Sequence, residues 1–91
     1  MYKVKFYNKA LEQYYNIWTY IAEDNIFYAK EVIDKIDSSI SIIAEYPFIW
    51  NEIEQWIRRI TEPRYKYKIV YEIKWNIIYI ISVFKYKNLW E

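Results

Sequence analysis

The most constraining feature of this sequence is the strict alternation of side-chain type over residues 65–73. Aromatic or aliphatic residues fill every second position, and residues that are mostly charged stand between them. A period of two residues over this length is typical of a strand with one buried face. Lys66 and Lys68 are therefore predicted to lie on the solvent-facing side of one strand.

Two further segments predict the neighbours of this strand. Residues 77–84 are apolar on both faces apart from Ser82, which indicates a central strand that is covered on both sides. Residues 74–76, which separate the two predicted strands, are few enough for a hairpin turn. We expect Asn76 to adopt the left-handed backbone conformation that such a turn needs. With a strand over residues 56–61, the C-terminal third is predicted to be a three-stranded antiparallel meander with basic side chains on one face.

The N-terminal half predicts one strand and two helices. Residues 2–7 alternate as a strand, and Asn8 is placed to cap a helix that runs to about residue 22. Apolar residues at helical spacing predict the buried side of this helix: Leu11, Tyr14, Trp18 and Ile21. A polar break with capping chemistry at residues 23–25 precedes a second amphipathic helix over residues 26–45, which ends before Pro47.

The order of these elements predicts the fold class. Residues 48–54 are expected to be a connection that packs back onto the core. Strand, helix, helix and three strands (β-α-α-β-β-β) indicate one α+β domain over residues 1–91, with a helical hairpin on one face of a four-stranded sheet.

The composition excludes several kinds of site. The chain has no cysteine, histidine or glycine, so it has neither thiolate nor imidazole metal ligands, and no glycine-rich phosphate loop. We expect no metal and no cofactor. The uncharged run of residues 75–84 is much shorter than the roughly 20 residues of a membrane helix, and the start does not resemble a signal peptide. The prediction is a cytoplasmic protein with no membrane partner.

Charge is distributed unevenly along the chain. Residues 1–57 hold five Lys/Arg and nine Asp/Glu, a net charge of −4, whereas residues 58–91 hold eight and three, a net charge of +5. This asymmetry suggests a basic working surface on the C-terminal half, although sheet edges also carry lysine simply to remain soluble.

Motifs in this order resemble a known family. The string that contains Pro63, Tyr65, Tyr67-Lys68-Ile69-Val70-Tyr71 is similar to the P-x-Y-R-I-V-Y core of the RelE/ParE toxins, the toxic halves of bacterial toxin–antitoxin pairs. Further fragments also match the family: Ile17-Trp18-Thr19-Tyr20-Ile21-Ala22, Ile43-Ala44-Glu45-Tyr46-Pro47, and Val83 to Trp90. Trp50 and Lys85 depart from it, because ParE-like sequences often have Gly and His there.

The resemblance implies a function and leaves its target open. The short length and the ending favour the ParE branch, whose members poison DNA gyrase by binding it and are neutralised by a cognate antitoxin. A RelE-like, ribosome-dependent mRNA interferase is the alternative, with ribosome and mRNA as partners. A module that only binds its antitoxin is a third possibility. In each case a toxin–antitoxin hetero-oligomer is expected.

The candidate site residues are mainly basic. Those expected to contact the target or the antitoxin are Arg58, Arg59, Arg64, Lys68, Lys85, Tyr86, Lys87 and Trp90. If the protein is a nuclease, Lys66, Lys68 and Lys85 are the catalytic candidates, because general base chemistry without histidine falls to lysine, tyrosine or a carboxylate. Tyr86 stands where nuclease members carry arginine. The competing interpretation of each lysine is a solvated surface charge. Trp50, Trp56 and Trp90 lie near loops or ends, where an exposed ring would mark a partner surface.

Overall fold

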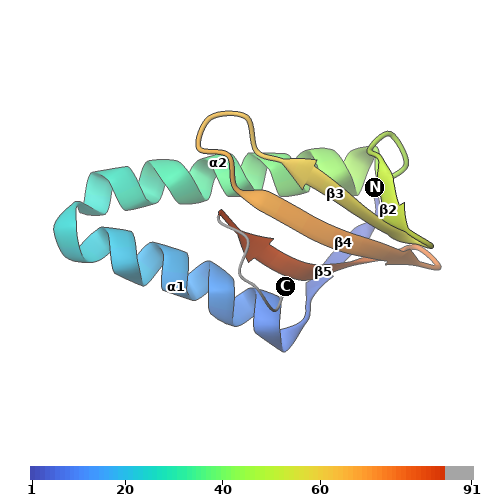
Figure 1. The fold of residues 1–91 in the computed structure, drawn as a ribbon, viewed down its shortest axis with the longest axis horizontal. Coiled ribbons are helices and arrows are strands. Elements are labelled where there is room, and N and C mark those ends of the chain that lie inside the picture. Colours follow the sequence, from blue (N-terminus) through green and yellow to red (C-terminus); the bar gives the residue numbers. More distant parts are fainter. Residues whose placement is uncertain (86–91) are drawn as a thin grey trace.

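The computed structural model describes residues 1–85 as a helical hairpin packed on one face of a twisted sheet (Figure 1). The elements in chain order are β1 (Lys3–Phe6), α1 (Asn8–Asp24), α2 (Ile26–Glu45), β2 (Glu52–Glu54), β3 (Ile57–Thr61), β4 (Lys68–Lys74) and β5 (Ile77–Phe84). The predicted α+β class and the predicted order of helices and strands are confirmed.

The strands form one sheet in the order β1-β5-β4-β3-β2. β1 runs parallel to β5, and the other neighbours are antiparallel. β5 lies between β1 and β4, in agreement with its prediction as a central strand. Within residues 1–85 the sheet has five strands, whereas four were predicted. The additional strand is residues 52–54, which were predicted as a connection but pair with β3 as an edge strand. The sequence signal was weak because both faces of this short strand are exposed and two of its residues are glutamates.

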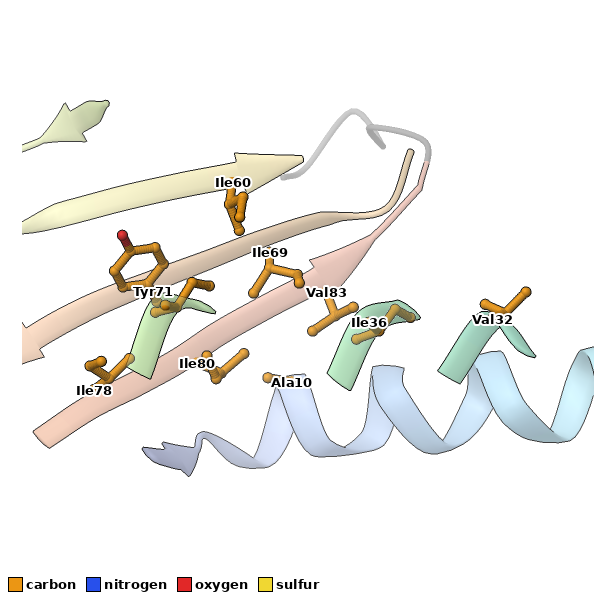
Figure 2. Close-up of a cluster of buried hydrophobic side chains, with 10 residues drawn as sticks. Ala10, Val32, Ile36, Ile60, Ile69, Tyr71, Ile78, Ile80 and Val83 are labelled. Atoms are coloured by element: carbon orange, nitrogen blue, oxygen red, sulfur yellow. The ribbon is translucent and has the colours of Figure 1, made fainter. Parts of the chain in front are cut away.

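The hydrophobic core lies between the helices and β3, β4 and β5 (Figure 2). Its members are Ala10, Val32, Ile36, Ile43, Ile60, Ile69, Tyr71, Ile78, Ile80 and Val83. Alternate residues of each strand point to this core, which confirms the half-buried character predicted for β4.

The predicted buried side of helix α1 is confirmed at Tyr14 and Ile21 and is wrong at Leu11. Its residues that contact the core are Ala10, Tyr14, Ile17 and Ile21. Leu11 is 38% exposed and lies beside this stripe. The N-cap is Tyr7 without any side-chain cap, so Asn8 is the first helical residue and the predicted Asn8 cap is wrong. The chain passes directly from β1 into the helix, and packing of Ala10 against the sheet sets the rotation of the helix about its axis.

Helix α2 begins and ends at the predicted residues, Ile26 and Glu45. The Asn25 side-chain oxygen accepts a hydrogen bond from the Tyr28 N–H at 3.0 Å, so it satisfies one of the N–H groups left open in the first turn. Capping chemistry at this break is confirmed.

Within residues 1–85 of this glycine-free chain, three residues adopt a positive φ: Trp56 (67°), Lys66 (69°) and Trp75 (58°). The left-handed residue of the β4–β5 hairpin is therefore Trp75 and not Asn76, which corrects the prediction. In the left-handed region a side chain crowds the backbone, at a cost of roughly 1–2 kcal/mol per residue.

The β3–β4 turn shortens the predicted strand at its N-terminal end. Buried Glu62 accepts hydrogen bonds from the N–H groups of Arg64 (2.7 Å) and Tyr65 (2.6 Å), and its backbone pairs with Lys66 and Tyr67. The strand consequently begins at Lys68 and not at residue 65. Lys66 lies in the turn, so the predicted shared strand face of Lys66 and Lys68 is wrong.

Candidate functional site

The face of the sheet opposite the helices carries an open groove of about 330 Å³. Its floor is mainly apolar and its edges carry charge. The groove crosses from the start of α1 to β2 and is lined by Lys9, Ile53, Glu54, Ile57, Arg59, Val70, Ile81, Ser82 and Phe84. A concave apolar surface with few polar groups is the usual form of a binding site.

A bulge in β5 shapes this groove. The register between β4 and β5 shifts after Val70, and the consecutive residues Ser82 and Val83 are both buried. The Gln13 side-chain oxygen on α1 accepts hydrogen bonds from the Val83 N–H (2.7 Å) and from the Ser82 hydroxyl (3.1 Å). The helix thereby satisfies the Val83 N–H, while Ile81 and Phe84 line the open face.

The adjacent arginines of β3 point to opposite faces. Arg59 is exposed and lines the groove. Arg58 is part-buried, and its Nη1 donates to the carbonyl oxygens of Trp50 (2.5 Å) and Phe48 (3.3 Å). Its guanidinium also lies over the Phe48 ring, 5.4 Å from the centroid. Of the two predicted contact residues, Arg59 faces the groove, while Arg58 holds the loop that precedes β2.

Arg64 lies in the β3–β4 turn on the side of α2. Its guanidinium is 5.6 Å from the centroid of the Tyr65 ring, and the Tyr65 hydroxyl donates to Glu31 Oε2 on α2 at 2.5 Å. The hydrogen bond with Tyr65 raises the pKa of Arg64, and the hydrogen bond with Glu31 raises the pKa of Tyr65. The structure does not bring Arg64 to the groove.

Two of the predicted lysines lie where β4 begins and β5 ends. Lys68 pairs with Phe84 across the sheet, and the Lys85 Nζ lies 5.6 Å from the centroid of the Tyr67 ring. Lys66 is exposed in the preceding turn. The structure thus places Lys68 beside Phe84 at the end of the groove, whereas Lys85 contacts Tyr67, which packs against the core. The predicted residues Tyr86, Lys87 and Trp90 lie outside the described residues.

A second polar cluster occupies the opposite end of β4. The Tyr7 hydroxyl donates to Glu72 Oε1, and the Lys74 Nζ lies 3.4 Å from the same oxygen. Lys74 also lies over the Tyr79 ring, which contacts the Tyr7 ring. The hydrogen bond with Glu72 raises the pKa of both Tyr7 and Lys74. Within this cluster the Glu72 carboxylate is paired with Lys74, and the raised pKa values keep Tyr7 and Lys74 protonated.

Several tyrosines share this resistance to ionisation. The pKa of Tyr14 is raised by burial and by its hydrogen bond to Asp37, and burial raises the pKa of Tyr71 to about 12. These phenols are protonated at neutral pH and cannot act as general bases there. Within residues 1–85, no group of three or more acidic side chains is placed to hold a metal ion. No helix in the same range is long and apolar enough to cross a membrane.

Sequence reasoning missed most of the groove's lining. Lys9, Glu54 and Ile53 come from segments that were predicted as a helix start and a connection. The sequence signal for this surface was the apolar outer face of residues 77–84, which was interpreted as a face covered by other parts of the chain. In the structure that outer face is the floor of an open groove.

Comparisons with known proteins agree with this architecture. The sequence profile of the ParE toxin of the type II toxin–antitoxin system parDE matches residues 4–90. Among solved structures, the chromosomal ParDE system from P. aeruginosa is similar with a TM-score of 0.79 and 15% identity, covering 96% of this chain and 98% of that chain. The intact E. coli RelBE toxin–antitoxin complex is similar with a TM-score of 0.73 and 17% identity, covering 97% of this chain and 100% of that chain.

The isolated E. coli RelE toxin is also similar, with a TM-score of 0.72 and 17% identity over 97% of this chain and 87% of that chain. No curated protein sequence matches significantly. At these identities the structural likenesses establish the fold, whereas the profile match over nearly the whole chain establishes the family. The chain therefore belongs to the ParE toxin family of type II toxin–antitoxin systems.

Proposed function

We propose that this protein is a toxin that inhibits DNA gyrase by binding it, and that an antitoxin segment neutralises it by occupying the groove on the open face of the sheet. The observation that carries this proposal is the groove itself. Its floor is apolar, and Arg59 and Lys9 stand at its edges. Such a surface suits an amphipathic protein segment, because apolar burial and charge-assisted hydrogen bonds can act together.

Inhibition by contact is also supported by the chemistry of the described side chains. A ribonuclease needs a base for the attacking hydroxyl and an acid for the leaving oxygen. The tyrosines with shifted pKa values, Tyr7, Tyr14, Tyr65 and Tyr71, all hold their protons more firmly than usual. Binding to a protein target requires no such base.

The deciding experiment measures two activities of the purified protein side by side. One assay follows supercoiling of relaxed plasmid by gyrase, and the other follows the integrity of mRNA on translating ribosomes. We expect loss of supercoiling with intact mRNA. Codon-spaced mRNA cleavage with normal supercoiling would refute the gyrase proposal, and no effect in either assay would leave only the antitoxin-binding role.

Two variants separate the mechanisms at the level of residues. A toxin that acts by contact should lose growth arrest in Lys87→Glu and keep it in Lys68→Ala, because Lys68 is then only a charge at the edge of the binding surface. An interferase should show the reverse. The position of Lys68 beside Phe84, at the end of the groove, is the observation that favours this second candidate, since a cation there can stabilise a phosphorane.

Antitoxin binding can be tested with two basic residues, Arg59 in the groove and Lys85 just after β5. We expect Arg59→Glu combined with Lys85→Glu to weaken the complex with the antitoxin encoded beside this gene, as measured by calorimetry. Lys30→Glu is the control, because Lys30 is exposed like Arg59 but lies on α2, away from the open face. Equal affinities for the wild type and the double variant would place the antitoxin elsewhere.

A further inference from the structure

Two tryptophans stand at neighbouring hairpin tips at one end of the sheet. Trp56 lies in the β2–β3 turn and Trp75 in the β4–β5 turn, and both turns lie at the end of the sheet far from the α1–α2 turn (Figure 1). The Trp56 carbonyl oxygen accepts a hydrogen bond from the Ile73 N–H at 3.4 Å, which ties the two tips together. A shallow groove of about 380 Å³ is lined by both indoles together with Gln55, Glu72, Ile73 and Lys74.

Stability of the fold does not explain these residues. Trp56 is 60% exposed and Trp75 is 95% exposed, so the indole of Trp75 buries almost no surface. Both residues also have a positive φ, which costs a bulky side chain roughly 1–2 kcal/mol. Trp50, by contrast, packs against the core. Exposed aromatic residues held in strained turns point to a contact made outside this chain.

The indoles lack the partners that other rings of the protein have. Elsewhere on the sheet, cations lie over Tyr or Phe rings, as Arg58 does over Phe48 and Lys85 over Tyr67. Indole binds cations better than phenol or benzene does. Within residues 1–85, neither Trp56 nor Trp75 has a cation over its ring or another ring against it.

The charge around the two tips is negative. Residues 52–56 and 72–76 contain three glutamates and one lysine, a net charge of −2. Glu72 is matched by Lys74 at 3.4 Å, whereas Glu52 and Glu54 are exposed, and Glu52 Oε2 lies beside Trp56 because it accepts a hydrogen bond from the Trp56 N–H at 2.7 Å. Lys3 on β1 is nearby, because its backbone N–H donates to the Asn76 carbonyl oxygen. When its charge is added to that of residues 52–56 and 72–76, the sum is still negative.

We infer that this end of the sheet is a second protein-binding site, which takes arginine side chains from a partner protein. A guanidinium can stack flat on an indole and donate to a carboxylate at the same time, which an ammonium does less well. Trp56 and Trp75 supply the rings, and Glu52 and Glu54 supply the charge. The groove between the two tryptophans shares no lining residue with the open-face groove proposed for the antitoxin, although Glu54, two residues before Trp56, lines the latter. The inference does not depend on whether gyrase is the target.

The test uses the indole N–H signals of the ¹⁵N-labelled protein, assigned with Trp56→Phe and Trp75→Phe. The probe is a blocked peptide of alternating arginine and glycine, and the matched peptides carry lysine or glutamate in place of arginine. We expect the arginine peptide to shift the signals of Trp56 and Trp75 in a saturable way, the lysine peptide to bind more weakly, and the glutamate peptide to leave them unmoved.

Variants then connect the shifts to the site. Glu54→Lys should weaken binding of the arginine peptide about fivefold, as expected for the loss of roughly 1 kcal/mol of charge attraction. Trp75→Gly, which keeps the fold because the turn favours glycine, should abolish the Trp56 shift or reduce it strongly. Tyr20→Ala is the matched control, because Tyr20 is 77% exposed at the other end of the molecule, and it should change nothing.

Three results would overturn the inference. The first is that arginine and glutamate peptides shift the two indoles equally, or that neither does. The second is that the indole signals move with protein concentration alone, which would make this end a contact between two copies of the chain. The third is that vesicles of phosphatidylglycerol broaden these signals while the arginine peptide has no effect, which would make it a lipid contact.

Discussion

The buried hydroxyl of Tyr71 donates a hydrogen bond of 2.7 Å to the carbonyl oxygen of Pro47. Tyr71 lies in the central part of β4 and is fully buried, while Pro47 begins the segment that leads from α2 to β2. One side chain therefore anchors the end of the helical hairpin to the sheet. A buried carbonyl that loses such a partner is left unsatisfied.

Tyr71→Phe tests this anchor. The change removes one hydroxyl and leaves the Pro47 carbonyl oxygen without its donor, so we expect the free energy of unfolding to fall by about 1–3 kcal/mol. Urea denaturation followed by far-UV circular dichroism measures the loss. Tyr20→Phe, at an exposed position, should lie within about 0.5 kcal/mol of the wild type. Equal stability of the two variants would show that the hydrogen bond contributes nothing.

The free energy of unfolding should also fall at alkaline pH. Burial raises the pKa of Tyr71 from 10.0 to about 12, and the pKa values of Tyr7, Tyr14 and Tyr65 are raised as well. Because the unfolded phenols lose their protons first, the free energy of unfolding should be constant up to about pH 10 and fall as the pH rises towards 12. Denaturation midpoints between pH 8 and 12 measure this, and the fall should be less steep in Tyr71→Phe. Stability that rises above pH 10 would contradict the shifts.

The adjacent arginines of β3 should behave differently when each is replaced by alanine. Arg58→Ala removes the donors to the carbonyl oxygens of Trp50 and Phe48, so the free energy of unfolding should fall by about 1.5–3 kcal/mol. Arg59→Ala, at an exposed position in the groove, should change it by about 0.5 kcal/mol or less and should instead weaken antitoxin binding. Equal losses of stability would mean that Arg58 does not hold the loop.

Glycine should stabilise the turns with positive φ. Lys66→Gly and Trp75→Gly each relieve a left-handed strain of roughly 1–2 kcal/mol and add roughly 0.5–1 kcal/mol of chain entropy to the unfolded state, for a net gain of about 0.5–1 kcal/mol. Thermal denaturation measures the gain. Asn76→Gly is the control, since Asn76 has no positive φ and should gain nothing. A loss of stability in Trp75→Gly would show that the indole contributes to the fold.

Gln13 should be needed for the β5 bulge. Gln13→Leu removes the acceptor for the Val83 N–H and the Ser82 hydroxyl, so we expect a loss of about 1–3 kcal/mol. In hydrogen exchange, the Val83 amide should lose its protection more than amides in the centre of β4. Gln13→Glu keeps an acceptor and should retain most of that protection, whereas Glu12→Ala, on the exposed side of α1, should have no effect. Unchanged exchange in Gln13→Leu would contradict the role of this side chain.

The sequence by itself determined the elements whose signals are local. The bounds of α2 follow from Asn25, the apolar period and Pro47, and all of these act within a few residues. The bounds of β5 and its central position follow from its apolar run, although the cover predicted for its outer face is wrong, since that face is the floor of the open groove. The family resemblance depended on motifs spread over the chain, and the profile match confirms it.

Tertiary structure decided the features that depend on distant contacts. The turn at buried Glu62 starts β4 at Lys68, although the alternation of residue types continues through residue 65. The groove is lined by residues of α1, β2, β3, β4 and β5, and the β5 bulge beside it has hydrogen bonds to Gln13, far away in sequence. Arg58 and Arg59 are the same residue type at adjacent positions. In the sheet formed by β3 and β4, Arg58 faces the loop before β2 and Arg59 faces the groove. Local periodicity specifies which residues can be buried, whereas register and side-chain direction are fixed by partners that the local sequence does not contain.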